Sequence, residues 1–246
     1  MKTLALESSA KAASCALLDG DTVVGEFFLH TGQTHSQTLL PMVEQLLTLG
    51  GVTPAQLELL AVAAGPGSFT GLRIAMAAVK GLAMARDIPC CGVSTLEALA
   101  WNLRGAQGLA GAVMDARRDQ VYAALFWLDG AGGVRRLTQD DAIPIEELGR
   151  QLAQHRGDQK NSVWLLGDGA MLCYNALLKD LPEVRPAPAH LRLQRASSVG
   201  ALAQQAAAAG EAVSCRELTP RYLRLPQAQR ELLSRQGTPP QQDAEK

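Results

Sequence analysis

The chain has 246 residues, 47% of them hydrophobic, and a formal net charge of −1. This composition is typical of a globular protein with a substantial core, and the length fits one large domain or two small ones. The nearly balanced charge excludes binding of nucleic acid or membranes through bulk charge, so any RNA contact would need a local patch or a partner.

The amino terminus is predicted to form three antiparallel strands. The first covers residues 3–9, and the other two lie within 14–29, joined by an Asp-Gly turn. A helix is predicted over 36–50, where leucine and valine recur at helical spacing before a glycine.

A glycine-rich loop, AAGPGSFTGLR (63–73), joins a predicted strand (57–64) to a predicted helix (70–86). Its spacing fits neither a P-loop, which needs a Lys-Ser or Lys-Thr pair, nor the G-x-G-x-x-G dinucleotide motif. Two interpretations remain open. The loop is either a tight turn that lets the strand and helix pack closely, or a weak anion site at a helix N-terminus.

The second half of the chain repeats the order of the first half. After a strand (88–94) and a helix with a capping box (94–103), residues 108–137 read as strand, polar loop, strand, turn and strand, like residues 2–28. Further elements are a strand at 162–170 and helices at 144–156, 170–180 and 197–210.

This repetition predicts an α/β protein with two lobes. We expect an N-terminal lobe over residues 1–105 and a C-terminal lobe over 106–225. Residues 226–246 are polar and rich in Gln and Pro, so we expect a disordered tail.

Features of secretion are absent from the sequence. No run of about 18 uncharged apolar residues predicts a transmembrane helix, and the first residues, with Glu7 among them, make a poor signal peptide. We expect buried thiols, without a structural disulfide or a zinc site, in the reducing cytoplasm. The cysteines are Cys15, Cys90, Cys91, Cys173 and Cys215.

Six stretches in order together resemble the TsaB (YeaZ) family over about residues 1–225. They are LALESSAKAASCALL, HSQTLLPMVEQLL, VAAGPGSFTGLRIAMAAVKGLA, GVSTLEALA, MDARRDQVYAALF and TPRYLRLP. The resemblance implies a two-lobed actin/Hsp70/sugar-kinase-like fold (ASKHA, RNase H-like), with mixed sheets flanked by helices. It also implies a non-catalytic scaffold subunit required for threonylcarbamoyl transfer to the tRNA adenosine beside the anticodon.

The partners that the resemblance implies are the paralogue TsaD, in a heterodimer, and the ATPase TsaE. It further implies a homodimer of the isolated chain, contact with tRNA only through the complex, and no membrane. An independent hydrolase of glycoprotease or peptidase type, or a degenerate nucleotide-binding enzyme of the same fold, remains the alternative.

The metal site of the paralogue is expected to be missing. TsaD carries two histidines four residues apart on one helix, which can both reach one metal. Thr95 and Leu99 stand at the matching positions here, and the four histidines of this chain do not rebuild the pair. We therefore expect no metal, no cofactor and no catalytic residue.

A nucleotide site is expected to survive only as a remnant. Glu7 and Asp115 each end the first strand of a lobe, and Gly167 and Gly169 resemble the adenosine-contacting turn of the fold. The second loop lacks the glycines that would let its backbone close on a phosphate. Gly167-Asp168-Gly169 is alternatively an ordinary turn between a strand and a helix.

The helix after the glycine loop is apolar over most of its circumference, as is the helix at 36–49. Such a helix must bury apolar side chains on two sides. One side packs on its own sheet, and the other packs on either another helix of this chain or a partner. We expect a partner interface built from Leu39, Val43, Leu46, Gly71, Leu72, Ala75, Ala78, Val79 and Leu82.

Overall fold

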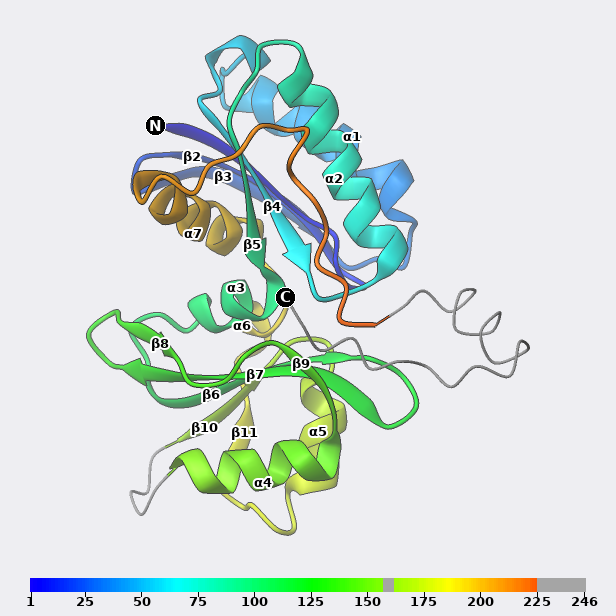
Figure 1. Cartoon of the computed structure of the whole chain (residues 1–246), viewed down its shortest axis with the longest axis vertical. Coiled ribbons are helices and arrows are strands. Elements are labelled where there is room, and N and C mark those ends of the chain that lie inside the picture. Colours follow the sequence, from blue (N-terminus) through cyan, green and yellow to red (C-terminus); the bar gives the residue numbers. More distant parts are fainter. Residues whose placement is uncertain (157–161, 225–246) are drawn as a thin grey trace.

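Two twisted sheets, one above the other in Figure 1, organise the chain in this computed structural model, which describes residues 1–156 and 162–224. The expected tail over 226–246 lies outside the described residues. Among the described helices, none is long and apolar enough to cross a bilayer.

The upper sheet has the strand order β3-β2-β1-β4-β5. The opening strands β1, β2 and β3 pair antiparallel, which confirms the predicted amino-terminal meander, while β4 and β5 run parallel to β1. The central strands β1 and β4 are almost entirely buried, as expected of strands covered on both faces. The bounds are β1 (Lys2–Glu7), β2 (Ala13–Asp19), β3 (Thr22–Leu29), β4 (Leu59–Gly65) and β5 (Cys90–Ser94).

The lower sheet has the order β11-β10-β6-β7-β8, and β9 also pairs with β7. In both sheets the first strand of the lobe is central, with an antiparallel hairpin on one side and two parallel strands on the other. This shared topology confirms the predicted duplication. The bounds are β6 (Gln107–Asp115), β7 (Gln120–Asp129), β8 (Val134–Arg136), β9 (Asp141–Pro144), β10 (Val163–Leu166) and β11 (Val184–Pro186).

Each sheet has an outer pair of helices. Side chains of α1 (His35–Leu49) and α2 (Phe69–Met84) share a buried core with one face of the upper sheet, and α4 (Ile145–Arg156) and α5 (Ala170–Leu177) do the same for the lower sheet. A short 3-10 helix, η1 (Pro54–Gln56), follows α1. The outer helices therefore lie where the apolar periodicity of the sequence predicts helices.

The inner faces of the sheets are covered by exchanged helices. The helix α7 (Ala196–Ala208) follows the lower lobe in sequence, but its Val199 and Ala203 pack in one core with Ala5 of the upper sheet. In the opposite direction, α3 (Thr95–Trp101) packs Leu96 and Leu99 against the lower sheet.

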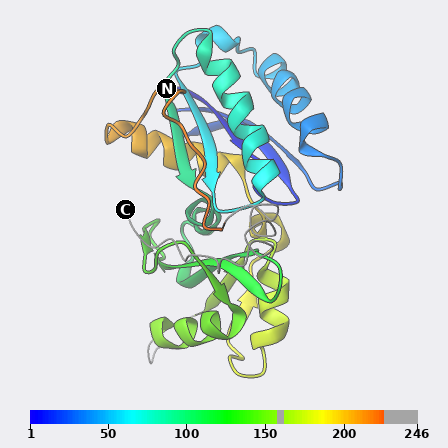
Figure 2. The same cartoon turned by 45° about the vertical axis from the view of Figure 1, so that its right-hand side comes forward.

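The packing of the elements does not follow the expected division of the chain into residues 1–105 and 106–225. Residues 196–224 return to the N-terminal lobe, because the small side chains of α7 fit the alanine-rich inner face of its sheet. After α7 the chain pairs with β5 at Val213 and runs beside α2 to the junction of the lobes (Figures 1 and 2).

One asparagine ties the exchanged helices together. Asn102, at the end of α3, donates from Nδ2 to the carbonyls of Leu191 (2.9 Å) and Leu193 (2.8 Å). Leu191 belongs to the short helix α6 (Ala189–Arg192). The hydroxyl of Ser198 in α7 donates to Oδ1 of Asn102 at 2.6 Å. All five cysteines are buried, as predicted.

Candidate functional site

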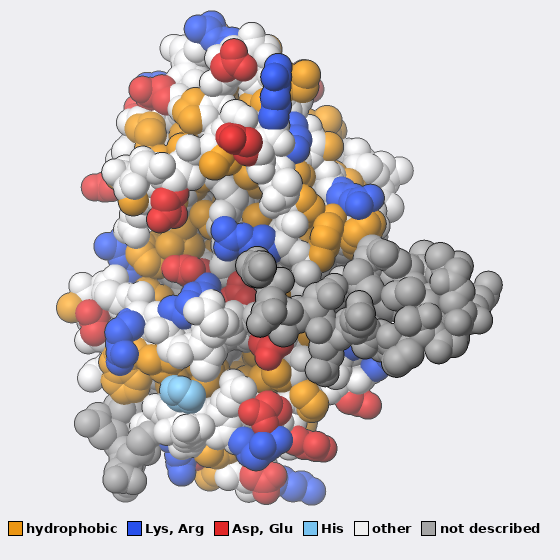
Figure 3. Space-filling view, in the orientation of Figure 1, with side chains coloured by type: hydrophobic (Ala, Val, Ile, Leu, Met, Phe, Trp, Pro, Cys, Tyr) orange, Lys and Arg blue, Asp and Glu red, His pale blue; other side chains and the backbone are white. Residues whose placement is uncertain are grey.

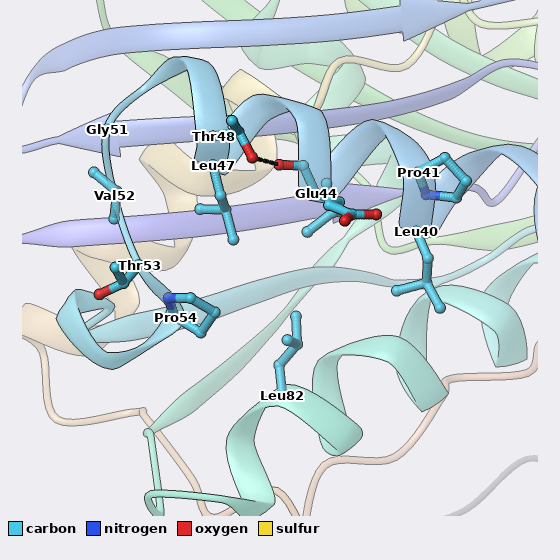
Figure 4. Close-up of a pocket in the computed structure, with 11 residues that line it drawn as sticks. Leu40, Pro41, Glu44, Leu47, Thr48, Gly51, Val52, Thr53, Pro54 and Leu82 are labelled. Carbon is cyan, nitrogen blue, oxygen red and sulfur yellow. Dashed lines mark hydrogen bonds between the residues drawn. The ribbon is translucent and has the colours of Figure 1, made fainter.

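An apolar groove of about 880 Å³ lies between α1 and α2 on the outside of the upper lobe. Leu40 and Leu47 of α1 and Leu82 of α2 project into it, and Val52 and Pro54 close one end (Figure 4). The only carboxylate among its lining residues is Glu44. The groove thus presents hydrocarbon to solvent, which is characteristic of a surface that another protein covers.

Both helices carry large exposed apolar side chains, and Leu40 among them lines the groove. Leu40 is 53% exposed, Leu49 at the end of α1 is 69% exposed, and Met84 at the end of α2 is 72% exposed. Sequence analysis did not assign these three residues to the interface. Leu40 lies beside the buried stripe of α1 in the helical spacing, and this was the signal that could have identified it.

Most of the predicted interface residues lie inside the lobe, which corrects that prediction. These side chains pack against the sheet or between the two helices, because α1 and α2 cover each other. The buried ones are Leu39, Val43, Leu46, Gly71, Leu72, Ala75 and Val79. Ala78 and Leu82 are partly exposed, and Val43, although buried, lines the groove together with Leu82.

The glycine-rich loop is packed tightly against the loop after β1. Ser68 donates its backbone N–H to the carbonyl of Ser9 at 2.6 Å, and the Ser8 hydroxyl donates to the carbonyl of Gly71 at 2.9 Å. A side chain at Gly71 would collide with the Ser8 carbonyl oxygen. These contacts support the tight-turn interpretation of the loop, with Ser68 capping α2 through the Gly71 N–H.

Three carboxyl groups from both lobes lie at the junction. Glu7 ends β1 and is fully buried, and this desolvation raises its pKa to about 7, with a smaller contribution from the charge of Asp168. Burial also raises the pKa of Asp168, which accepts the N–H of Asp115 at 3.4 Å. The fold therefore brings together Glu7 and Asp115, the two acidic residues that the sequence singled out.

The predicted adenosine turn already uses its backbone donors. Gly167, at φ +100°, donates its N–H to the carbonyl of Arg192 at 2.6 Å, and Gly169 donates to the carbonyl of Val113 at 3.3 Å. A side chain at Gly167 would collide with the Val113 carbonyl. As folded, these two glycines pack the turn against β6 and offer no free N–H to a phosphate.

Thr95 and Leu99, which the resemblance sets at the positions of the paralogue's histidines, are core residues. Leu99 lies in the apolar core between α3 and the lower sheet, and Thr95 is fully buried. Within residues 1–156 and 162–224, no group of three or more His, Cys, Asp or Glu side chains is arranged to hold a metal ion.

Known proteins resemble this chain over most of its length. The family model of TsaD, described as tRNA N6-adenosine threonylcarbamoyltransferase, matches residues 29–232. The tRNA threonylcarbamoyladenosine biosynthesis protein TsaB of Escherichia coli is 32% identical over 227 residues, which cover 91% of this chain and 95% of that protein.

The chain belongs to the TsaB (YeaZ) family. A second TsaB protein, from Bacillus subtilis, is 42% identical over 126 residues, about half of either chain (51% of this one and 55% of that one). YeaZ from Pseudomonas aeruginosa superimposes with a TM-score of 0.73 at 29% identity, covering 90% of this TsaB-family chain and 99% of that one.

A more distant structure shows only the fold. Component A of the Acidaminococcus fermentans (R)-2-hydroxyglutaryl-CoA dehydratase is 12% identical, with a TM-score of 0.50 over 85% of this chain and 99% of that one. Together with the duplicated lobes, the comparisons confirm the predicted actin/Hsp70/sugar-kinase-like fold class for this TsaB-family chain.

Proposed function

We propose that this chain is a non-catalytic accessory subunit that binds TsaD and is required for threonylcarbamoyl transfer to tRNA. Membership of the TsaB family carries the proposal, since the curated relatives are named as threonylcarbamoyladenosine biosynthesis proteins. Such a subunit would work in the cytoplasm, where tRNA is modified.

The groove between α1 and α2 supplies the docking face. It is apolar and lined by the exposed side chain of Leu40, so the removal of water from it by a partner would be favourable. The similarity to the TsaD family model begins at residue 29 and spans both helices. TsaD should therefore present a related helix pair, and the two faces would pack against each other with near-twofold symmetry. In the absence of TsaD, a second copy of this chain would take its place.

A scaffold role also agrees with the residues found at the junction between the lobes. Leu99 cannot ligate a metal, and the Gly167 and Gly169 N–H groups are engaged by carbonyls of this chain. The participation of TsaE follows from the family resemblance and is part of the same proposal.

Leu40→Glu tests the docking face. Leu40 is more than half exposed, so the variant should fold, but a buried unpaired charge in the complex costs several kcal/mol. Since about 1.4 kcal/mol is tenfold in affinity, we expect binding to TsaD to weaken by at least about a hundredfold. Sedimentation of purified mixtures measures this directly, and tRNA modification by the reconstituted complex should fall in parallel.

Leu178→Glu is the matched control. Leu178 is 40% exposed, but it lies at the end of α5 in the other lobe, away from the groove. It should leave TsaD binding unchanged. A folded Leu40→Glu variant that binds TsaD as tightly as the control would place the interface elsewhere.

A further inference from the structure

The segment that follows α7 connects the two lobes on one face of the molecule. Arg221 donates its backbone N–H to the carbonyl of Ala64 at the end of β4, at 2.7 Å. Three residues later, Arg224 donates from its guanidinium to the carbonyl of Ala116 in the lower lobe at 2.8 Å and also to the Gln120 side chain. Residues 221–224 therefore bridge the glycine-rich loop of one lobe and the β6–β7 turn of the other.

Arginine and aromatic side chains interleave at the upper end of this bridge. The guanidinium of Arg73, in the first turns of α2, lies 3.8 Å from the centre of the Phe69 ring, and its Nε donates to the Tyr222 hydroxyl at 3.0 Å. The Phe69 and Tyr222 rings are 4.8 Å apart. Arg73 and Tyr222 are exposed, so this stack faces solvent.

Two more arginines stand at the lower end. Arg117 and Arg118 occupy the β6–β7 turn directly beside Ala116, where Arg224 is anchored. Both are exposed, and both have positive φ angles, of 66° and 56°. The turn therefore places two exposed arginines directly after the residue whose carbonyl anchors Arg224.

We name this surface the arginine strip and define it as Arg73, Arg117, Arg118, Arg221 and Arg224 with the rings of Phe69 and Tyr222. The segments 66–73, 116–119 and 219–224, which supply it, contain five arginines and a single acidic residue, Asp119. These segments thus carry an excess of four positive charges on a chain whose formal net charge is −1. Glu97 and Asp140 line a pocket with Arg221, but both carboxylates are paired with Arg136.

The strip lacks the carboxylate partners that other arginines of this protein have. Arg136, Arg150 and Arg195 each lie within 4 Å of a Glu or Asp oxygen. Within the described part of the chain, no carboxylate lies that close to any of the five strip arginines. Guanidinium groups without a carboxylate partner, next to an exposed tyrosine ring, suit a ligand that combines phosphate charge with flat bases.

From this arrangement we propose that the arginine strip is a direct RNA-binding surface, which contacts the phosphate backbone of the tRNA and stacks on unpaired bases. The inference rests on the proposed function, because that function brings tRNA to the complex. It changes one expectation from the sequence, namely that this chain meets tRNA only through its partners. An acidic protein surface is the competing occupant, and the experiment separates the two.

The test compares Arg117→Glu/Arg118→Glu with the wild-type protein in complex with TsaD. The probe is an unmodified tRNA transcript with an adenosine beside its anticodon, and its binding is followed by fluorescence anisotropy between 50 and 200 mM salt. We expect affinity at least about tenfold lower, and a slope of log K against log salt reduced by about 1.4–1.8 for two lost phosphate contacts. Arg117→Lys/Arg118→Lys should retain most of the affinity, since it keeps both charges.

Lys179→Glu/Arg185→Glu is the charge-matched control. Both residues are exposed in the lower lobe, outside the strip, and the change in net charge is the same. This variant should bind tRNA like the wild type. Arg221→Glu, on the bridge, should weaken tRNA binding in the same direction as the turn variant.

Binding to TsaD is measured in parallel for every variant. A turn variant that binds tRNA as well as the control overturns the proposal, as does a wild-type complex that binds tRNA no better than TsaD alone. A turn variant that loses TsaD while its own tRNA affinity is unchanged identifies the strip as a protein-binding surface instead. If the wild-type chain fails to bind TsaD, the proposed function is wrong. The tRNA affinity of the full chain alone, compared with that of the turn variant, then still tests whether the arginine strip binds RNA.

Discussion

Glu7 places a titratable carboxyl group inside the protein at the junction of the lobes. Its Oε1 accepts the N–H of Ser9 at 2.5 Å, while Oε2 has no hydrogen-bond partner within the described residues. Burial raises the pKa of this group from 4.5 to about 7, so the folded state favours the protonated form. The charge of Asp168, from the opposite lobe, acts in the same direction.

Stability should therefore fall as pH rises. Below pH 4.5 Glu7 is protonated in both states, and between 4.5 and about 7 only the folded state holds the proton, so the free energy of unfolding decreases through this window. Glu7→Gln removes the titration and should stabilise the protein at pH 8 by up to about 3 kcal/mol. Urea unfolding at pH 5.5 and pH 8 measures the difference. Glu146→Gln, an exposed carboxyl on α4, should leave the pH dependence intact.

Thr95 and Leu99 lead to a prediction about metal content. Because Leu99 is a core residue and cannot donate a ligand, protein purified without chelator should contain no stoichiometric transition metal. Elemental analysis that found about one zinc or iron ion per chain would contradict this.

The surroundings of some single residues could be predicted from the sequence and those of others could not, for a physical reason. The tight turn of the glycine-rich loop was one of the two interpretations that its spacing allowed, although Gly71 itself was assigned to the partner interface. The burial of Val43 and Val79 could not be predicted, because an apolar side chain on a helix reads the same whether it meets a sheet, a neighbouring helix or a partner. The contact between Glu7 and Asp168 depends on how the two lobes close.

The helices α1 and α2 show the same limit at the scale of elements. Their existence and approximate ends follow from the period of their leucines and alanines, and the structure agrees with both. What the sequence could not provide is the direction of each face. Tertiary packing uses the stripe at Ala75 and Val79 for the sheet and leaves Leu82 on the groove.

Ala78→Glu tests the edge of that groove. Ala78 lies one turn before Leu82 and is partly buried against the core, so we expect a folded protein with a modest loss of stability, about 1 kcal/mol. Its affinity for TsaD and its self-association should fall at least tenfold. Ala77→Glu, at the exposed neighbouring position, is the control.

Circular dichroism and sedimentation separate the possible outcomes for Ala78→Glu. An unfolded variant would show that this side of α2 belongs wholly to the core. A folded variant with unchanged dimerisation would show that the partner binds another surface.

At the scale of the molecule, the exchange of α3 and α7 makes the two lobes depend on each other. Each sheet has one face covered by a helix that is contiguous in sequence with the other lobe. The duplication of the lobes was predictable from the repeated strand pattern. The return of α7 was not, because its Val199 and Ala203 would fit any small-residue surface.

Unfolding should therefore occur as one transition. Backbone circular dichroism and the fluorescence of Trp101, Trp127 and Trp164 should report the same urea midpoint. Asn102→Ala removes the three hydrogen bonds that join the end of α3 to Leu191 in α6, to Leu193 and to Ser198 in α7. It should lower the free energy of unfolding by about 1–3 kcal/mol. The exposed Asn175→Ala on α5 should have little effect. Two separated midpoints would contradict the coupling.

The position of α7 near the end of the chain also sets the order in which the lobes can form during translation. The strands and helices of the lower lobe, from α3 to β11, leave the ribosome as one continuous stretch and can assemble as they emerge. The upper sheet is synthesised first, but its inner face stays uncovered until residue 208 has been added. At about 5–20 residues per second, the interval from the end of β5 at residue 94 is roughly 6–23 s. The lobe that begins the protein is therefore the last to be completed, and its alanine-rich face is a target for chaperones during that time.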